Sequence, residues 1–394
     1  MLKHLFKLMW NKKKQNLLLV IEIFFSFLVI FALASIAAYY YRNYRLPMDL
    51  DDQDVWIVNY NNPNQTNRND SLALFYENVR KAVTSEPQVM EASYASNNTP
   101  FGTGMSITSF GSGKEAVDRV YYYTSDEYYP KVLGLHLLEG RWFSRQDLAD
   151  AHPPIVINES LRDAAFGHVP VVGRLVGNKQ DPHPQRIIGV IADVKVEGDY
   201  HPSTPSMYVP IDTDGFRWMG TMLVKVSPDA DAASEGRIYK LLSGAIRNSN
   251  IGIRHMSNDR ANKNNASLVP LIIFGIIAAF LVLNVAFGLF GVLWYNINRR
   301  KGEIGLRRAV GASGWSVTGQ LWLETMILAT FALILGTFFA IQFPLLHVFD
   351  LPTRVYIEAL FFAILFIYAL ATICSLYPGR QAAAIFPAEA LHED

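Results

Sequence analysis

The sequence predicts a membrane protein with four transmembrane α-helices and a large α+β extracytoplasmic domain inserted between the first and second spans. Three observations lead to this fold class. Of the 394 residues, 51% are hydrophobic and only 18% are charged, a high ratio for a soluble protein of this size. The apolar residues gather in four runs long enough to cross a bilayer. The 225 residues from 42 to 266, between the first two runs, have an ordinary soluble composition.

The N-terminal part predicts a surface segment followed by a membrane anchor. Residues 1–16 carry five lysines and no acid, and we expect a cytoplasmic amphipathic segment there. Residues 17–41 predict transmembrane helix 1, with Glu22 as the only charge before residue 41. The run is longer than a signal-peptide core and continues past the small-residue site Ala32-Leu33-Ala34, which favours an uncleaved anchor over a cleaved signal peptide.

Residues 42–266 read as alternating short strands and helices, which is typical of an α+β domain and suggests βαβ-type units. Strands are expected where β-branched and aromatic residues cluster, at Val55–Tyr60, Ser106–Phe110, Val117–Tyr123, Ile155–Ile157, Arg186–Ile191, Met207–Ile211 and Met222–Val226. Helices are expected at Leu72–Thr84, Asp126–Leu133, Glu159–Phe166 and Ala232–Arg247.

The C-terminal part predicts three more spans. Transmembrane helices are expected at 267–296, 317–343 and 355–377, joined by a cytoplasmic loop at 297–316 and an outer turn at 344–354, with a cytoplasmic tail at 378–394. The second apolar run, Leu268–Tyr295, has 28 residues without a charge, more than a bilayer requires, so this helix is expected to tilt or to project beyond the lipid. Pro378 is expected to end the fourth helix.

Charge gives the orientation. The N-terminal segment and the loop 297–316 hold five Lys and Arg residues each, whereas the outer turn holds one. Short basic connections stay in the cytoplasm, so both termini are expected there and the large domain outside. The intramembrane acids Glu22, Glu324 and Glu358 lie near helix ends, which favours interfacial or pairing roles over a proton path.

No motif predicts an enzyme. The chain contains neither H-E-x-x-H nor G-x-S-x-G. Residues Phe110–Glu115 resemble the end of a phosphate-binding loop, but Lys114 is followed by Glu and the first glycine of that motif is missing. His152, His168, His183 and His201 are scattered in loops, so no metal site is expected. Cys374 is the single cysteine and net charge is zero, which predicts no disulfide and no nucleic-acid partner.

The loop 297–316 indicates a function more specifically than the other motifs do. Glu303 and Arg307 form an i,i+4 pair, and Ile297, Ile304 and Ala309 give a short helix a partial apolar face. Gly311 suits a C-cap and Ser313 an N-cap. The residues alone leave two interpretations open: a basic helix resting on anionic headgroups, or a helix that docks into a cytoplasmic partner.

Residues 300–312, Arg-Lys-Gly-Glu-Ile-Gly-Leu-Arg-Arg-Ala-Val-Gly-Ala, resemble the signature of MacB/FtsX-type ABC transporter permeases. The C-terminal stretch from Tyr377 to Leu391 is similar to the closing motif of that family. Three stretches between the first two spans, at 132–141, 157–161 and 188–194, resemble the MacB-like periplasmic core domain. Gly302 stands where relatives carry a longer polar residue, which leaves open whether a helix begins before or after it.

The resemblance implies a permease without a fused ATPase, in the bacterial inner membrane. A separate cytoplasmic ABC ATPase would use ATP and Mg, so no cofactor is expected on this chain, and the work would move the extracytoplasmic domain (mechanotransmission). The implied coupling residues are Arg300, Glu303, Ile304, Gly305, Arg307, Arg308, Gly311 and Ala312, and the implied tail residues are Pro378, Arg380, Pro387, Ala390 and Leu391.

Further partners follow from the same resemblance. A second permease copy or a paralogue would complete a dimer, and a periplasmic adaptor and an outer-membrane channel are possible additions. Efflux of a drug, peptide or other amphiphile is the expected function. The alternatives are an FtsX-like regulator of an extracytoplasmic cell-wall hydrolase and a lipoprotein-extracting permease.

Overall fold

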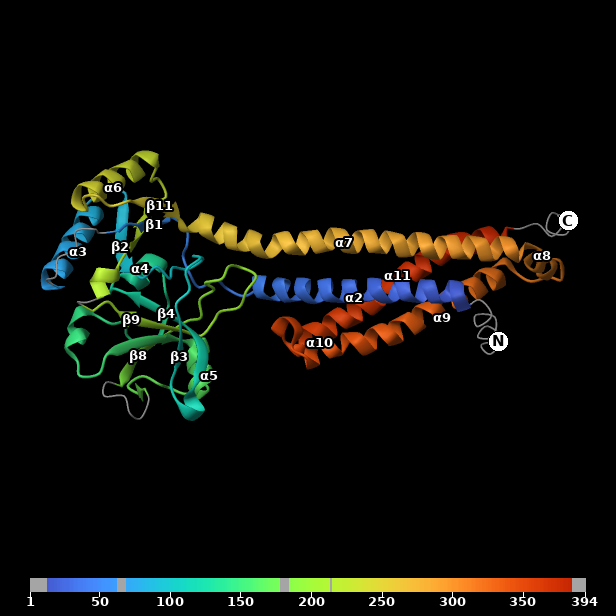
Figure 1. The fold of residues 1–394 in the computed structure, drawn as a ribbon, viewed down its shortest axis with the longest axis horizontal. Helices are drawn as coiled ribbons and strands as arrows, with labels where there is room; N and C mark the ends of the chain where they lie inside the picture. Colours follow the sequence, from blue (N-terminus) through green and yellow to red (C-terminus); the bar gives the residue numbers. More distant parts are fainter. Residues whose placement is uncertain (1–12, 62–68, 178–183, 213–214, 385–394) are drawn as a thin grey trace. The chain divides into compact units, whose positions relative to one another are not determined.

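The computed structural model describes residues 13–61, 69–177, 184–212 and 215–384, and Figure 1 shows their helices and strands. The chain divides into two compact units. The helical unit comprises residues 1–42 and 268–394, and the α/β unit comprises Asn43–Ser267. The predicted fold class, four apolar helices with a mixed domain between the first and second, is confirmed.

Among the described residues, four long helices are apolar and long enough to cross a membrane, and their parts within residues 1–42 and 268–394 make up the helical unit. They are α2 (Lys13–Tyr44), α7 (Met256–Arg299), α9 (Gly314–Ala340) and α11 (Thr353–Ala383). Shorter elements connect them: α8 (Lys301–Ala309), α10 (Gln342–Leu345) and the 3-10 turn η4 (Val348–Asp350). Close packing is visible at Gly336, where an added Cβ would lie 2.4 Å from the ring of Phe27, so only glycine lets α2 and α9 approach in this way.

Two helix ends differ from the sequence prediction by more than four residues. Helix α7 begins at Met256, well before Leu268. The added turns are polar, and hydrogen bonds to other residues of the α/β unit hold them in helical form. Helix α11 continues past Pro378 to Ala383, so the prediction that this proline ends the helix is wrong. Proline fits helical backbone angles and removes one hydrogen bond. Here Pro378, Gly379 and Ala382 are buried, and packing on both sides of the proline holds the last turns.

The strands of the α/β unit pair into one mixed sheet in the order β11-β1-β10-β2-β4-β9-β6-β8-β5, with β3 beside β4 and β7 beside β8. Their bounds are β1 Val55–Asn59, β2 Val89–Ala95, β3 Ile107–Phe110, β4 Val117–Ser125, β5 Leu137–Gly140, β6 Pro154–Asn158, β7 Leu175–Val176, β8 Gln185–Ile191, β9 Ser206–Pro210, β10 Thr221–Val226 and β11 Gly252–His255.

The central strands are buried on both faces. In β1, Val55 and Ile57 join one hydrophobic cluster whereas Trp56 and Val58 join another, because successive side chains of a strand point to opposite faces. The second cluster lies under the helices α3 (Asn69–Thr84) and α6 (Ala232–Ala245). A third cluster lies between the other half of the sheet and α5 (Glu159–Phe166). The sheet therefore needs cover from helices and loops on both sides.

All four predicted helices of this unit are present, with α4 (Tyr129–Leu133) shorter than expected. The prediction of βαβ-type units was too broad. Strands β6 and β8 with α5 form a parallel unit of this kind, and β4 pairs with β9 in parallel. The other strand pairs of the described residues are antiparallel. The strands β2, β5, β7 and β11 were missed. Strand β2 contains Glu91, Ser93 and two alanines, and only Val89 and Tyr94 favour a strand. Its pairing with β10 makes it a strand.

Candidate functional site

Helix α8 follows α7 after a single residue. Helix α7 ends at Arg299, Arg300 has non-helical angles (φ −110°, ψ 16°), and α8 runs from Lys301 to Ala309. The helix therefore begins before Gly302, which settles the point that the sequence left open. We call residues 300–315 the α8 segment.

The end of α8 is set by a glycine. Gly311 has φ +100°, a backbone conformation that disfavours side chains. Its N–H donates to the carbonyl of Arg308 at 3.1 Å, and the N–H of Ala312 donates to that of Arg307 at 3.0 Å. This pair of bonds is a Schellman C-cap. The side chain of Ser313 then accepts from the N–H of Ser316 and caps α9, so both predicted caps are confirmed.

The inner face of α8 is a small hydrophobic cluster. Ile304 is 8% exposed and packs with Ile297 of α7, Val317 and Leu321 of α9, and Ala382 of α11. Gly305 is also buried. Ala309, which the sequence placed on the same apolar face, is exposed, because α8 ends there and turns away from the cluster. The cluster draws on three long helices, so a displacement of α8 acts on all of them.

An ion-pair network joins α8 to α9. Arg300 donates to Glu303 at 3.0 Å and to Glu324 of α9 at 3.2 Å. Arg307 donates to Glu303 at 2.6 Å and to Gln320 at 2.8 Å. The predicted Glu303–Arg307 pair is therefore present, but it is one link of a chain that begins at Arg300.

The three intramembrane acids have different surroundings. Glu324 pairs with Arg300, from another part of the helical unit, as the interpretation of pairing across helices expected. Glu358 pairs with Arg354 at 3.0 Å one turn away on its own helix, α11. Glu22 lies against α7, where an added Cβ on Gly288 would be 2.6 Å from its carboxylate oxygen. No hydrogen bond or ion pair of Glu22 is recorded within the described parts of the chain.

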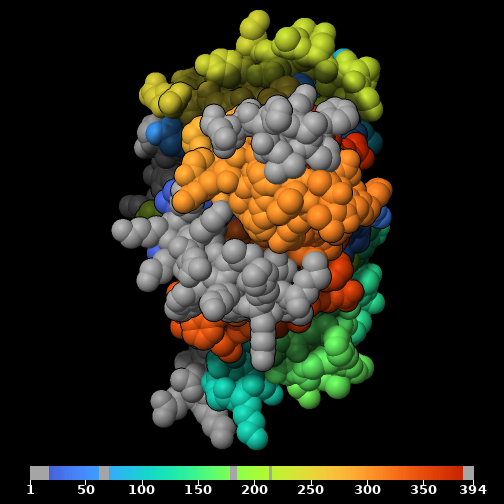
Figure 2. Space-filling view, turned by 90° about the vertical axis from the view of Figure 1, so that its right-hand side faces the viewer, coloured from blue at the N-terminus to red at the C-terminus, as the bar shows by residue number. Residues whose placement is uncertain are grey.

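The outer face of the α8 segment is apolar and exposed. Leu306 is 55% exposed, Val310 is 83% and Trp315 is 82%. Figure 2 looks onto the end of the helical unit where α8 lies, and the orange atoms of this part of the chain form an outward surface there. None of these three residues is among the coupling residues that the resemblance implied. Large apolar residues are unusual in a basic loop, so the sequence did contain a sign of an exposed apolar surface. The direction in which these side chains point depends on how α8 packs.

The implied coupling residues thus separate into two groups. The first group is largely buried and forms the base of α8: it contains Ile304, Gly305 and Arg300, and the side chain of Arg300 is 16% exposed. The side chains of Glu303 and Arg307 are 45% and 44% exposed, Gly311 is exposed, and Arg308 and Ala312 are half-buried.

The C-terminal end of α11 supports the same region. The hydroxyl of Thr318 on α9 donates to the carbonyl of Gly379 at 2.9 Å. Pro378 is buried and Arg380 is exposed. Pro387, Ala390 and Leu391 lie outside the described residues.

A second polar network holds the first turns of α7 within the α/β unit. Arg260 pairs with Asp52 and with Asp199, both at 2.7 Å, and Lys263 pairs with Glu197 at 2.7 Å. Lys195 is 3% exposed and donates to the carbonyls of Asn43 and Leu46, where α2 ends. Both chain connections of the α/β unit are therefore fastened to the loop that carries residues 195–199.

The other candidate chemistry finds no support. Residues 111–116 connect the antiparallel strands β3 and β4, not a strand and a helix as a phosphate-binding loop requires. No cluster of three potential metal ligands occurs in the described ranges, which contain His152, His168 and His201. His183 lies outside them.

Comparisons with known proteins match most of the chain. The family model of the MacB-like periplasmic core domain matches residues 17–237, and that of the FtsX-like permease C-terminal region matches residues 275–387. The Macrolide export ATP-binding/permease protein MacB 1/2 of Paracoccus denitrificans is 28% identical over 56% of this chain and 33% of its own length. The Uncharacterized ABC transporter permease YvrN of Bacillus subtilis is 24% identical over 80% of this chain and 78% of its own.

The length of the relatives and one solved structure limit what these comparisons show. The chain spans between about a third and a half of the length of the MacB relatives that it matches. The crystal structure of the periplasmic region of MacB from Actinobacillus actinomycetemcomitans matches at 17% identity over 54% of this chain and 94% of its own, with a TM-score of 0.37. A likeness of this size adds nothing to the family match.

Proposed function

The chain belongs to the MacB/FtsX-like family of ABC transporter permeases, and from this premise we propose that it is the membrane subunit driven by a separate cytoplasmic ATPase. The α8 segment is the proposed docking site for that ATPase. The observation that carries this proposal is the division of α8 into a buried, ion-paired base and an exposed apolar outer face. An exposed apolar patch beside charged residues is typical of a protein interface.

The two networks support a mechanical role for α7. Helix α7 has 44 residues, a length of about 66 Å at 1.5 Å per residue. Its last turns share a hydrophobic cluster with α8, and its first turns are ion-paired to Asp52, Asp199 and Glu197. In the proposed mechanism, ATP and Mg act in the partner, α8 receives the movement, and α7 transmits it to the α/β unit.

The proposal extends to orientation, assembly and cargo. The five basic residues in each of the loop 297–316 and the N-terminal segment support an orientation with both termini in the cytoplasm and the α/β unit outside the inner membrane. A second copy or a paralogue completes the dimer. Because several relatives are named for macrolide export, efflux of a drug, peptide or other amphiphile is the proposed activity, with a periplasmic adaptor and an outer-membrane channel as possible partners.

Two matched tryptophans provide the test of docking. Trp315 on the α8 segment and Trp218 in the α/β unit are both 82% exposed. Trp315→Asp is expected to reduce co-purification of a co-expressed ATPase by about tenfold or more, because exposed tryptophans at interfaces often carry much of the binding energy. Trp218→Asp is the control and is expected to leave it unchanged. Equal co-purification in both variants would contradict ATPase docking at α8 and favour the alternative in which α8 rests on headgroups.

A second variant separates docking from transmission. Arg260→Met breaks the ion pairs with Asp52 and Asp199 but lies in the α/β unit. We expect normal ATPase co-purification with a loss of transport. Full transport in Arg260→Met would show that α7 does not need this network to move the α/β unit.

A further inference from the structure

A cavity of about 160 Å³ lies in the α/β unit between α3 and the end of β4. Its walls are mainly apolar and include Ala73, Tyr94, Phe143, Leu148, Ile211 and Phe216. A cavity of about 150 Å³ in a protein core holds a benzene-sized molecule. The volume therefore suits a compound with a single ring and is too small for a large macrocycle.

One lining residue has a buried polar atom without a hydrogen-bond partner in the part of the chain that the structure describes. Ser125 ends β4, is 0% exposed and lines the cavity. Its hydroxyl oxygen makes no hydrogen bond within the described residues. A buried hydroxyl without a partner is costly, and more than nine in ten buried polar groups have one. A ligand with a hydrogen-bond donor would supply the missing partner.

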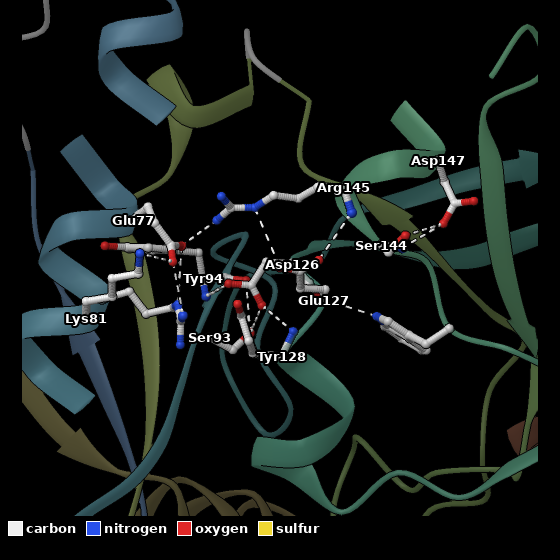
Figure 3. A network of polar contacts seen from close by, with 12 residues as sticks. Glu77, Lys81, Ser93, Tyr94, Asp126, Glu127, Tyr128, Ser144, Arg145 and Asp147 are labelled. Atoms are coloured by element: carbon white, nitrogen blue, oxygen red, sulfur yellow. Dashed lines mark hydrogen bonds and ion pairs between the residues drawn. The ribbon is translucent and has the colours of Figure 1, made fainter. Parts of the chain in front are cut away.

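The charged groups of the lining are predominantly negative. Glu77, Asp126 and Glu127 contribute carboxylates, and Arg145 contributes the one guanidinium in this lining. Figure 3 shows these four side chains around the loop that carries Asp126. Asp126 accepts from the hydroxyl of Ser93 at 2.7 Å and from the backbone N–H of Tyr94 at 2.8 Å. Burial raises the pKa of Asp126 to about 6, so this carboxyl is largely ionised at neutral pH.

Arg145 is a replaceable counter-ion. Its guanidinium contacts Glu77 closely and lies 3.6 Å from Glu127, yet its side chain is 56% exposed. Glu77 has other cations, since Arg80 donates to it at 3.2 Å and Lys81 lies 3.6 Å away. The guanidinium of Arg145 is open to solvent and Glu77 keeps Arg80 and Lys81 as partners, so a cationic ligand can take the place of Arg145 without leaving Glu77 unpaired.

We propose that this cavity binds a small ring compound carrying a protonated amine. The ring occupies the apolar space beside Phe143, Leu148 and Phe216, and the ammonium group lies near Ser125 and the carboxylates that Arg145 otherwise neutralises. This inference goes beyond the proposed function, because it assigns a ligand site inside the α/β unit that does not depend on an ATPase.

Protection of an introduced cysteine tests the site in the full chain. Cys374 is the single native cysteine, so Leu148→Cys in a Cys374→Ala background places one reactive thiol in the cavity wall. The alkylation rate is measured in detergent with benzylamine, benzyl alcohol or toluene. Benzylamine is expected to halve the rate at a concentration about tenfold below that of toluene, with benzyl alcohol between them, because charged hydrogen bonds are the stronger ones. Equal protection by toluene and benzylamine, or protection by none of the three, would overturn the proposal.

Three variants in the same background sharpen the result. Ser125→Ala is expected to weaken benzylamine protection about threefold to tenfold and to leave toluene unaffected, with Ser243→Ala, outside the cavity lining, as its control. Ala73→Phe fills the cavity and is expected to abolish protection by every probe.

Arg145→Gln removes the competing cation and is expected to strengthen benzylamine protection about threefold. Misfolding cannot produce this gain, and a loss of benzylamine protection in Arg145→Gln would contradict the proposed exchange. Unchanged thermal unfolding of each variant confirms that the fold is retained.

Discussion

Replacing Arg300 by methionine should destabilise α8 more than any exposed substitution in the same loop. The side chains of Arg300 and Glu324 are 16% and 15% exposed, and they lie 3.2 Å apart. Removing one member of a buried ion pair costs about 3–5 kcal/mol. Glu324 also accepts a hydrogen bond from Gln320 at 3.1 Å, which the substitution does not remove, so we expect a loss of about 2 kcal/mol in the free energy of local opening.

Hydrogen exchange measures this loss directly. The N–H of Ile304 donates to the carbonyl of Arg300 at 2.9 Å, and its exchange reports the opening of the first turn of α8. A loss of about 2 kcal/mol corresponds to roughly thirtyfold faster exchange. The matched control is Glu303→Gln, because the side chain of Glu303 is 45% exposed and its pairs should contribute about 1 kcal/mol or less.

A double substitution tests the reasoning. Arg300→Met with Glu324→Met removes both charges, and replacing a buried pair by apolar side chains is often neutral. We therefore expect more than half of the lost protection to return. If Arg300→Met exchanges no faster than Glu303→Gln, or if the double variant exchanges faster than the single one, the network does not hold α8 in place.

Three further predictions concern other parts of the chain. Gly311→Ala is expected to destabilise the end of α8 by about 1–2 kcal/mol, because φ at this position is +100°, although the space around the residue is open. The destabilisation should lower the midpoint of thermal unfolding, and an unchanged midpoint would contradict the strain argument. Lys195→Met should cost about 1–3 kcal/mol of unfolding free energy. It removes the ammonium donor from the Leu46 carbonyl and leaves the Asn43 carbonyl with the N–H of Leu46 alone. The exposed Lys240→Met should change the unfolding free energy by less than about 0.5 kcal/mol. The pKa of Asp126 is raised from 3.8 to about 6, so its contribution to stability is fully present below pH ~4 and is lost as the pH rises through ~6. The unfolding free energy relative to Asp126→Asn should therefore fall by up to about 3 kcal/mol over that range. A difference that does not change with pH would show that Asp126 titrates normally.

Features that depend on local composition could be predicted from the sequence. The four spans were found because a helix in lipid must be apolar along about 20 residues, whatever its neighbours are. Strands with runs of β-branched and aromatic residues, such as Val55–Asn59, were found for a similar reason. The caps at Gly311 and Ser313 follow from the chemistry of those two residues.

Features that depend on distant partners could not be predicted. The Asn-rich start of α7 is helical beside the ion pairs of Arg260 and Lys263, and α11 passes Pro378 where buried contacts hold it. The unpaired hydroxyl of Ser125 became visible only when segments far apart in the chain closed around it.

In the α8 segment, some features were determined by the local sequence and others by the tertiary structure. Its sequence determined a basic connection between two spans, a helix with an i,i+4 ion pair and a glycine that ends it. The tertiary structure decided that Ile304 faces α9 and that Leu306, Val310 and Trp315 face outward. The physical reason is that composition and spacing define a helical face, but the direction of that face depends on which residues of α7, α9 and α11 pack beneath it.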